Sequence, residues 1–111
     1  MKALNTILMS GREVLPLVEG GKGISVSNGE SSGAWALAGG VGTFSGVNAD
    51  SYDAQGEAIP QLYFGKTRRE RHEELLAYAI KGGIAQARIA YDMARGNGRI
   101  HMNVLWEMAG A

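Results

Sequence analysis

The chain has 111 residues, enough for one small domain that leaves much of its surface exposed. Its 11 basic and 11 acidic side chains cancel, which argues against a nucleic-acid partner because nucleic-acid surfaces normally carry a basic excess. The absence of cysteine excludes disulfides, thiolate metal sites and a cysteine nucleophile. The N-terminal apolar run is short and interrupted, unlike a secretory signal or a membrane span. We therefore expect a cytoplasmic protein with no membrane partner.

The first predicted strand covers residues 14–18, whose sequence VLPLV is apolar. Pro16 lacks an amide N–H, so it fits such a strand only at its beginning or at a sheet edge. The glycine-rich residues 20–27 are typical of a loop, but not of a Walker phosphate loop, because Lys22 precedes Gly23 rather than Ser or Thr. These glycines form either a flexible turn or a place where a flat ligand approaches the backbone.

A short helix is predicted over residues 31–37, with Ser27 or Asn28 as its N-cap. The glycines at 39 and 40 are expected to end this helix, as glycine does at a helix C-terminus. Residues 41–45, VGTFS, form the second predicted strand. The glycines of this region do not form a dinucleotide-binding fingerprint, because they lie between a helix and a strand rather than between a strand and a helix.

The second half of the chain predicts a long loop, a long helix and a third strand. Residues 47–66 form the loop, and loops of this length are often functional. Thr67 and Glu70 form a capping box for a helix that continues to about Arg95, with a bend or break at residues 82–83. Residues 100–105, IHMNVL, form the third strand. Strands alternating with helices predict an α/β fold with a parallel sheet.

Polar residues near the predicted strand ends are the candidates for function. His72 lies in the charged first turns of the long helix, where a solvated face is expected. His101 lies in a strand, where a lone histidine is more often a satisfied core group than a base. Neither has a partner for a catalytic triad or a metal site. Asn103 lies near the carboxyl end of a strand, where parallel sheets bind ligands, and it either contacts a ligand or satisfies nearby backbone.

The segments PLVEGGKGISVS and GAWALAGGVGTFSGV together resemble the opening of the nitronate monooxygenase (2-nitropropane dioxygenase) family of FMN-dependent enzymes. Residues 16–20 and 38–45 fill that family's P-(I/L)-(I/V)-x-G and A-G-G-(L/V)-G-x-x-(S/A) patterns, and HMNVLWEMAG is similar to its third strand. The resemblance implies the N-terminal part of a (β/α)₈ TIM barrel with FMN at its carboxyl-terminal mouth. It also implies that Gly21, Lys22 and Gly23 lie against the flavin ring and that Asn103 reaches the ring from the third strand.

The activity that the resemblance implies is oxidation of alkyl nitronates, or flavin reduction linked to NAD(P)H. Many family members carry Pro-Met where this chain has Gly21-Lys22, so the resemblance does not specify the substrate. A full barrel needs about 250 residues. We therefore expect residues 1–111 to form a single incomplete domain of about three strands and two helices, inactive alone, which could form a homo-oligomer. The family's catalytic histidine has no counterpart here, so no catalytic residue is predicted.

Two alternatives to this interpretation follow from the same residues. The chain could be a small non-enzymatic α/β module that acts by homo- or hetero-association, because its last predicted strand leaves a sheet edge open. It could also belong to another class of FMN barrel, such as dehydrogenases of the inosinate type. The residues that separate those classes lie outside the matched segments.

Overall fold

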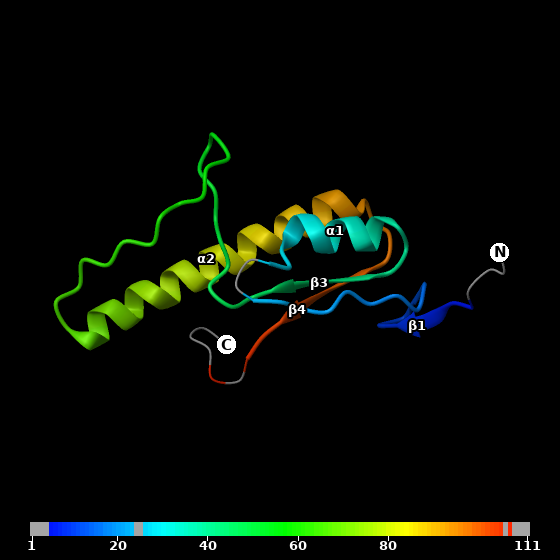
Figure 1. The fold of residues 1–111 in the computed structure, drawn as a ribbon, viewed down its shortest axis with the longest axis horizontal. Coiled ribbons are helices and arrows are strands. Elements are labelled where there is room, and N and C mark those ends of the chain that lie inside the picture. Colours follow the sequence, from blue (N-terminus) through cyan, green and yellow to red (C-terminus); the bar gives the residue numbers. More distant parts are fainter. Residues whose placement is uncertain (1–4, 24–25, 106, 108–111) are drawn as a thin grey trace.

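The computed structural model describes residues 5–23, 26–105 and 107, which form two helices and two small sheets. In chain order the elements are β1 (Ile7–Met9), β2 (Arg12–Val14), α1 (Gly29–Leu37), β3 (Val41–Ser45), α2 (Arg68–Ala94) and β4 (Arg99–Asn103). β1 and β2 form an antiparallel hairpin, and β3 and β4 form a parallel pair. The molecule is elongated, measuring 60 × 33 × 21 Å, with the hairpin at one end and the beginning of α2 at the other (Figure 1).

The N-terminal hairpin was not predicted from the sequence. Ser10 and Gly11 reverse the chain with φ angles of 51° and 80°, and two positive φ angles in succession are typical of a tight hairpin turn. Arg99 attaches the hairpin to β4 by donating from Nε to the Met9 carbonyl oxygen at 3.1 Å and from Nη2 to the Ser10 carbonyl oxygen at 2.5 Å. The missed signal was the Ser-Gly pair between two short extended segments.

The strand predicted over residues 14–18 is only partly present. β2 ends at Val14, and further on Val18 forms a single parallel bridge with Val41 of β3. The Val41 N–H donates to the Leu17 carbonyl oxygen and the Glu19 N–H donates to the Val41 carbonyl oxygen, each at 2.8 Å. Pro16 interrupts the strand because it has no N–H to donate. Residues 17–19, β3 and β4 therefore lie side by side and parallel; we call these three segments the parallel layer.

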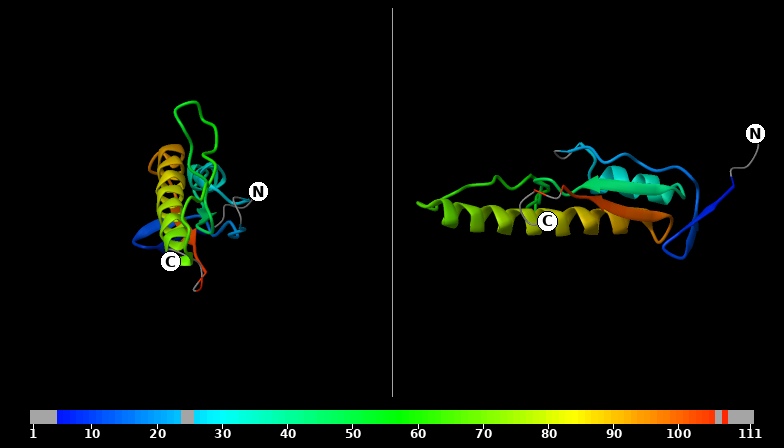
Figure 2. Two further views of the ribbon diagram at one scale, coloured as in Figure 1. Left: turned by 90° about the vertical axis from the view of Figure 1, so that its left-hand side faces the viewer. Right: turned by 90° about the horizontal axis from the view of Figure 1, so that it is seen from below.

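The (β/α)₈ barrel prediction is wrong for this structure, which contains two separate two-stranded sheets. A barrel closes only when every strand pairs on both sides around a ring. In the described part of the chain, β3 has neighbours on both sides, whereas β4 pairs with β3 alone. The N-terminal residues form a separate hairpin instead of widening the parallel layer. Figure 2 shows β3 and β4 running beside α2, with the hairpin beyond their ends.

α1 begins at Gly29, two residues before the predicted start, and its N-cap is one of the two predicted candidates. The Ser31 N–H donates to Asn28 Oδ1 at 2.9 Å, and the Asn28 N–H donates to Ser31 Oγ at 3.0 Å, which completes a capping box. Asn28 is therefore the N-cap, and Ser27 is not. The helix ends at Leu37 with Ala38 as its C-cap, followed by Gly39 with a φ of 98°, the left-handed conformation that glycine adopts without a steric penalty.

α1 and α2 pack closely because glycines face the contact between them. Gly29 and Gly33 are four residues apart and so lie on the same face of α1. A Cβ atom on Gly29 would overlap the Gln86 carbonyl oxygen, and one on Gly33 would lie 2.6 Å from the Met93 Cβ. Ala90, opposite Gly33, is fully buried. Small side chains therefore set the separation of the two helices.

α2 is one continuous helix of 27 residues, so the predicted bend or break at residues 82–83 is wrong. A Cβ atom on Gly82 would overlap the carbonyl oxygen of Ala49, which lies in the loop after β3. A Cβ atom on Gly83 would lie 3.5 Å from the Met102 side chain of β4. Gly82 therefore allows close approach of the loop, whereas a Cβ on Gly83 would make only an ordinary van der Waals contact with β4.

Gln86 is a polar side chain buried at the centre of the fold, with 2% of its surface exposed. Its Oε1 accepts the Gly29 N–H at 2.7 Å, and its Nε2 donates to the Asp50 carbonyl oxygen at 2.7 Å. The Gly29 N–H belongs to the first turn of α1, where N–H groups have no partner within the helix. Gln86 thus connects α2, the first turn of α1 and the loop after β3.

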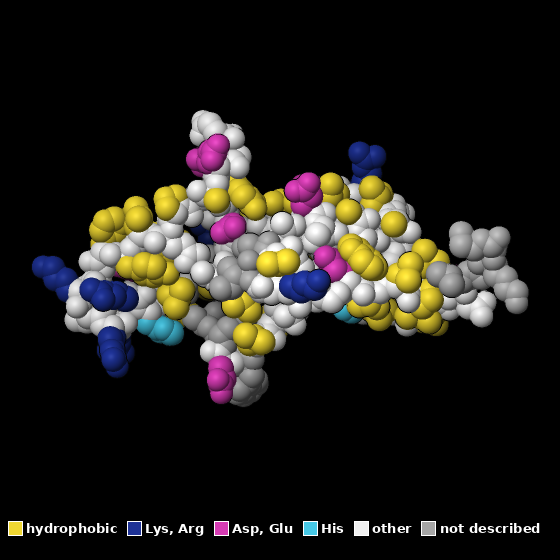
Figure 3. Space-filling view, viewed as in Figure 1, with side chains coloured by type: hydrophobic (Ala, Val, Ile, Leu, Met, Phe, Trp, Pro, Cys, Tyr) yellow, Lys and Arg dark blue, Asp and Glu magenta, His cyan; other side chains and the backbone are white. Residues whose placement is uncertain are grey.

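Much of the large apolar surface of the chain is not buried. The buried apolar residues are mostly small, whereas Phe64 is 81% exposed and Tyr91 is 67% exposed. Figure 3 shows apolar side chains along the whole visible face, and Lys and Arg gathered at the end of the molecule where α2 begins. Neither helix within the described residues is long and apolar enough to span a bilayer.

Replacing Gly29 by alanine should lower the free energy of unfolding by about 2–3 kcal/mol, because its methyl group would overlap a backbone oxygen of α2. Chemical denaturation followed by circular dichroism measures this change. Gly20→Ala is the matched control: a Cβ there meets no atom within 4 Å, so it should change stability by less than about 1 kcal/mol. Equal effects of the two substitutions would contradict the helix packing described above.

Replacing Gln86 by leucine should destabilise the fold by about 2–4 kcal/mol, because it leaves the Gly29 N–H and the Asp50 carbonyl oxygen buried without partners. The same denaturation experiment measures the loss. Gln55→Leu, at an exposed loop position, is the control and should stay within about 0.5 kcal/mol of the parent chain. A Gln86→Leu variant as stable as this control would refute the role of the buried amide.

Candidate functional site

The carboxyl ends of the three segments of the parallel layer meet at one edge of the molecule. A Cβ atom on Gly21 would lie 2.6 Å from the Asn103 Cβ, and one on Gly23 would lie 3.3 Å from Ser45 Oγ. These four residues, Gly21, Gly23, Ser45 and Asn103, are called the carboxyl edge below. The structure therefore brings Asn103 close to Gly21 and Gly23, three of the four predicted site residues, although Asn103 lies about 80 positions further along the sequence.

Lys22 lies between the two glycines with its side chain exposed. Its N–H donates to Ser27 Oγ at 2.7 Å, and its carbonyl oxygen accepts the Ser27 N–H and Oγ–H, each at 3.0 Å. The Ser27 carbonyl oxygen in turn accepts the Ser45 N–H at 2.9 Å. Buried Ser27 thus ties the turn at Lys22 to the end of β3 and leaves the Lys22 ammonium group on the surface.

Glu19 ends the pairing between residues 17–19 and β3. Its Oε1 accepts the Thr43 N–H at 3.0 Å, in the place where the next parallel ladder bond would need a backbone carbonyl. Its Oε2 accepts the Ser31 hydroxyl of α1 at 2.7 Å. The backbone therefore leaves the parallel layer at Gly20, and Gly21 lies against Asn103 at the end of β4. Glu19 was not among the predicted site residues, although a lone acid between an apolar segment and glycines was a signal.

Asn103 is the last residue of β4 and is half-buried. Its carbonyl oxygen accepts the Gly46 N–H at 2.9 Å, which holds the chain after β3 against the end of β4. None of the hydrogen bonds between described residues uses its carboxamide. A carboxamide offers two N–H donors and one oxygen acceptor, so Asn103 can present both kinds of group to a ligand at the carboxyl edge.

The two histidines do not join the carboxyl edge. His72 is exposed on α2, as the sequence predicted. His101, paired in register with Thr43, is also exposed rather than packed in the core as expected. The described residues contain no group of three or more His, Asp or Glu side chains arranged to hold a metal ion.

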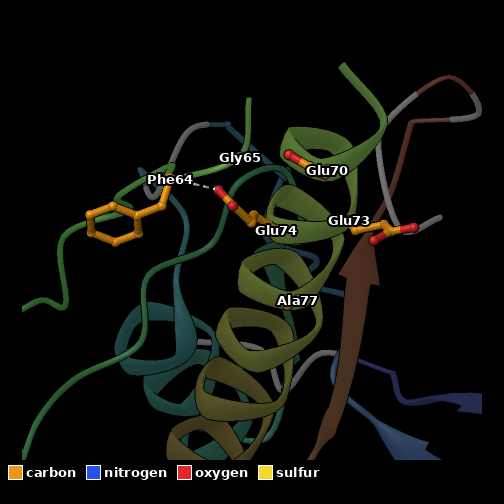
Figure 4. Close-up of a pocket in the computed structure, with 6 residues that line it drawn as sticks. All are labelled: Phe64, Gly65, Glu70, Glu73, Glu74 and Ala77. Carbon is orange, nitrogen blue, oxygen red and sulfur yellow. Dashed lines mark hydrogen bonds between the residues drawn. The ribbon is translucent and has the colours of Figure 1, made fainter. Parts of the chain in front are cut away.

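A hollow against the first turns of α2 is lined by Phe64, Gly65, Glu70, Glu73, Glu74 and Ala77 (Figure 4). Glu74 points to the Phe64 N–H and accepts it at 2.9 Å, while Glu73 points away from this contact. Glu70 and Thr67 form the predicted capping box: the Glu70 N–H donates to Thr67 Oγ1 at 3.1 Å, and the Thr67 N–H donates to Glu70 Oε2 at 3.3 Å. Two of the three carboxylates therefore bind backbone, and their role is to hold the loop against α2.

Comparisons of the chain with protein-family models, with curated proteins and with solved structures found no match. The resemblance to nitronate monooxygenases therefore remains a prediction from the sequence. The geometry of the carboxyl edge is independent of that resemblance.

Glu19→Ala should lower the free energy of unfolding by about 1–3 kcal/mol, because it removes the acceptor of the nearly buried Thr43 N–H. Thermal and chemical denaturation both measure this loss. Glu57→Ala removes the same charge from an exposed loop position and should change stability by less than about 0.5 kcal/mol. If both variants unfold alike, the Glu19 carboxylate does not end the ladder in the way described.

Proposed function

We propose that the carboxyl edge binds the isoalloxazine ring of FMN and that the chain acts in an FMN-dependent oxidoreductase of the nitronate monooxygenase type. The observation that carries the proposal is the packing of the Asn103 side chain against the bare backbone of Gly21. The substrate class is an alkyl nitronate, with NAD(P)H as an alternative electron donor. The resemblance of residues 16–20 and 38–45 to that family supports the same assignment.

The residues of the carboxyl edge are suited to a flat aromatic ring. Gly21 of this edge and the preceding Gly20 expose backbone without side chains, and a Cβ at Gly20 would meet no atom within 4 Å, so a planar ring can approach the main chain there. The Asn103 carboxamide lies beside this backbone and can donate to a ring carbonyl while accepting from a ring N–H. Backbone N–H and C=O groups and a side-chain carboxamide, two kinds of polar group that orient ligands in binding sites, are therefore adjacent.

Lys22 supplies the positive charge at this edge. Its backbone is held by Ser27, so the position of its Cα is fixed, while its exposed ammonium group can move to meet an anionic ligand. Bound FMN would supply the electron-transfer chemistry, and a cation beside the ring or the phosphate favours its negatively charged groups. The role of this chain's own residues is to bind and orient the cofactor.

Titration of FMN with the full chain, followed by flavin fluorescence, tests the proposal. Saturable quenching is expected, and Asn103→Ala should weaken binding about tenfold because it removes the amide contacts. Gly21→Val should weaken binding at least as much, since its side chain would occupy the Asn103 position. Arg88→Ala, on the exposed surface of α2, is the control and should leave binding unchanged. The consumption of propyl nitronate by the FMN-loaded chain is the corresponding activity assay.

Two outcomes would contradict the proposal. One is a chain that is folded by circular dichroism but does not quench flavin fluorescence at any attainable concentration. The other is quenching that Asn103→Ala and Gly21→Val leave unchanged, which would place the flavin elsewhere on the molecule. Circular dichroism of each variant separates loss of binding from loss of folding.

A second candidate function is association through the parallel layer. It is favoured by β4, which pairs with β3 on one side and has no strand on its other side among the described residues. An open strand edge presents unpaired N–H and C=O groups to another chain. Sedimentation velocity over a concentration series tests this function: a flavin-free chain that assembles into one defined oligomer supports it, and a chain that stays monomeric contradicts self-association.

A further inference from the structure

α2 carries an apolar seam that the fold does not cover, formed by Ala77, Ile80, Ile84, Ala87 and Tyr91. Successive members are separated alternately by three and four residues, the spacing of a coiled-coil interface. Ile80, Ile84 and Tyr91 are 56%, 49% and 67% exposed. Side chains of this size cost free energy when they are left in water, so an aligned set of them indicates a contact surface.

The seam is separate from the faces of α2 that stabilise the fold. α1 packs against Gln86, Ala90 and Met93, and the loop after β3 packs against Gly82. β4 contacts α2 through Gly83. None of these five residues belongs to the seam. Changes in the seam should therefore alter binding without removing a contact that holds α2 in place.

One side of the seam is basic. Lys81 and Arg88 are seven residues apart on α2, and both are exposed. Residues that recur every seven positions beside a coiled-coil seam are the ones that face the charged side chains of the partner helix. The other side of the seam is formed by residues turned toward the core, namely Leu76, Gly83 and Ala90. The basic side is therefore the one available to a partner's charges.

We propose that the seam binds an amphipathic helix of a partner protein whose apolar stripe is flanked by Asp and Glu residues. The heptad spacing selects a helix, and the cations of Lys81 and Arg88 select acidic flanking residues. A second copy of α2 would fit less well. In an antiparallel pair its own Lys81 and Arg88 would face the same cations, and in a parallel pair the facing positions would be Leu76 and Gly83, which carry no charge.

A pair of synthetic helical peptides tests the proposal by fluorescence anisotropy with the full chain. Both have leucine at the two apolar positions of each heptad, and one has glutamate at the flanking positions where the other has lysine. The glutamate peptide should bind about tenfold more tightly at low salt, since exposed ion pairs contribute modestly but add along a helix. High salt should reduce this preference by screening the charges.

Variants of the chain locate the binding surface. Ile84→Asp should weaken binding of the glutamate peptide by more than about tenfold, because it places a charge in the apolar contact. The double variant Lys81→Glu, Arg88→Glu should reverse the preference, so that the lysine peptide binds more tightly. The double variant Arg68→Glu, Arg69→Glu is the matched control: it makes the same charge change on α2 outside the seam and should leave the preference as in the parent chain. Circular dichroism confirms that each variant is folded.

Several results would overturn the proposal. Binding that Ile84→Asp does not weaken would place the peptide elsewhere, and equal binding of the two peptides would remove the charge argument. A dimer of the chain alone that Ile84→Asp dissociates would identify a second copy as the occupant. Flotation with vesicles of anionic phospholipid that depends on Ile84 would identify a membrane surface instead. None of these measurements involves flavin, so the seam and the proposed function can fail separately.

Discussion

The buried amide of Gln86 is the interaction on which the arrangement of the two helices depends. Through two of its hydrogen bonds it satisfies an N–H of the first turn of α1 and a carbonyl oxygen of the loop after β3. A buried amide is favourable only when its partners are in place, because an unpaired polar group in the interior costs more than a hydrogen bond returns. The orientation of α1 on α2 and the path of the loop are therefore coupled.

The core around this amide is built from small residues that let backbones approach one another. Beside the glycines between the helices, Gly42 of β3 is so close to α1 that a Cβ there would overlap the Ser32 carbonyl oxygen. α1 thus rests directly on β3, and the end of β3 has a defined place relative to the N-terminus of α1. Ser27 and Glu19 then tie the turn at residues 20–23 to that strand end, which is how the carboxyl edge is assembled.

A core of small residues has a consequence for function. Because the close contacts between backbones use alanine, glycine and serine, several of the large apolar side chains remain outside, on α2 and in the loop before it. Buried apolar area is the main source of stability in a small domain. Either proposed binding event, of a flat ligand at the carboxyl edge or of a partner helix along α2, would therefore add to the stability of the chain.

The sequence by itself determined the local structure of this protein. The polar caps at Asn28 and Thr67, the glycine at 39 and the strand-forming residues Val41, Thr43 and Phe44 were sufficient to predict that both helices and β3 exist, since capping, backbone conformation and strand propensity act between near neighbours. Only the tertiary structure decided that Pro16 leaves a single bridge and that the described strands do not close a barrel. It also placed Gly21 against Asn103 and gave Gly82 a packing role, because these contacts join residues distant in sequence and depend on close backbone approach.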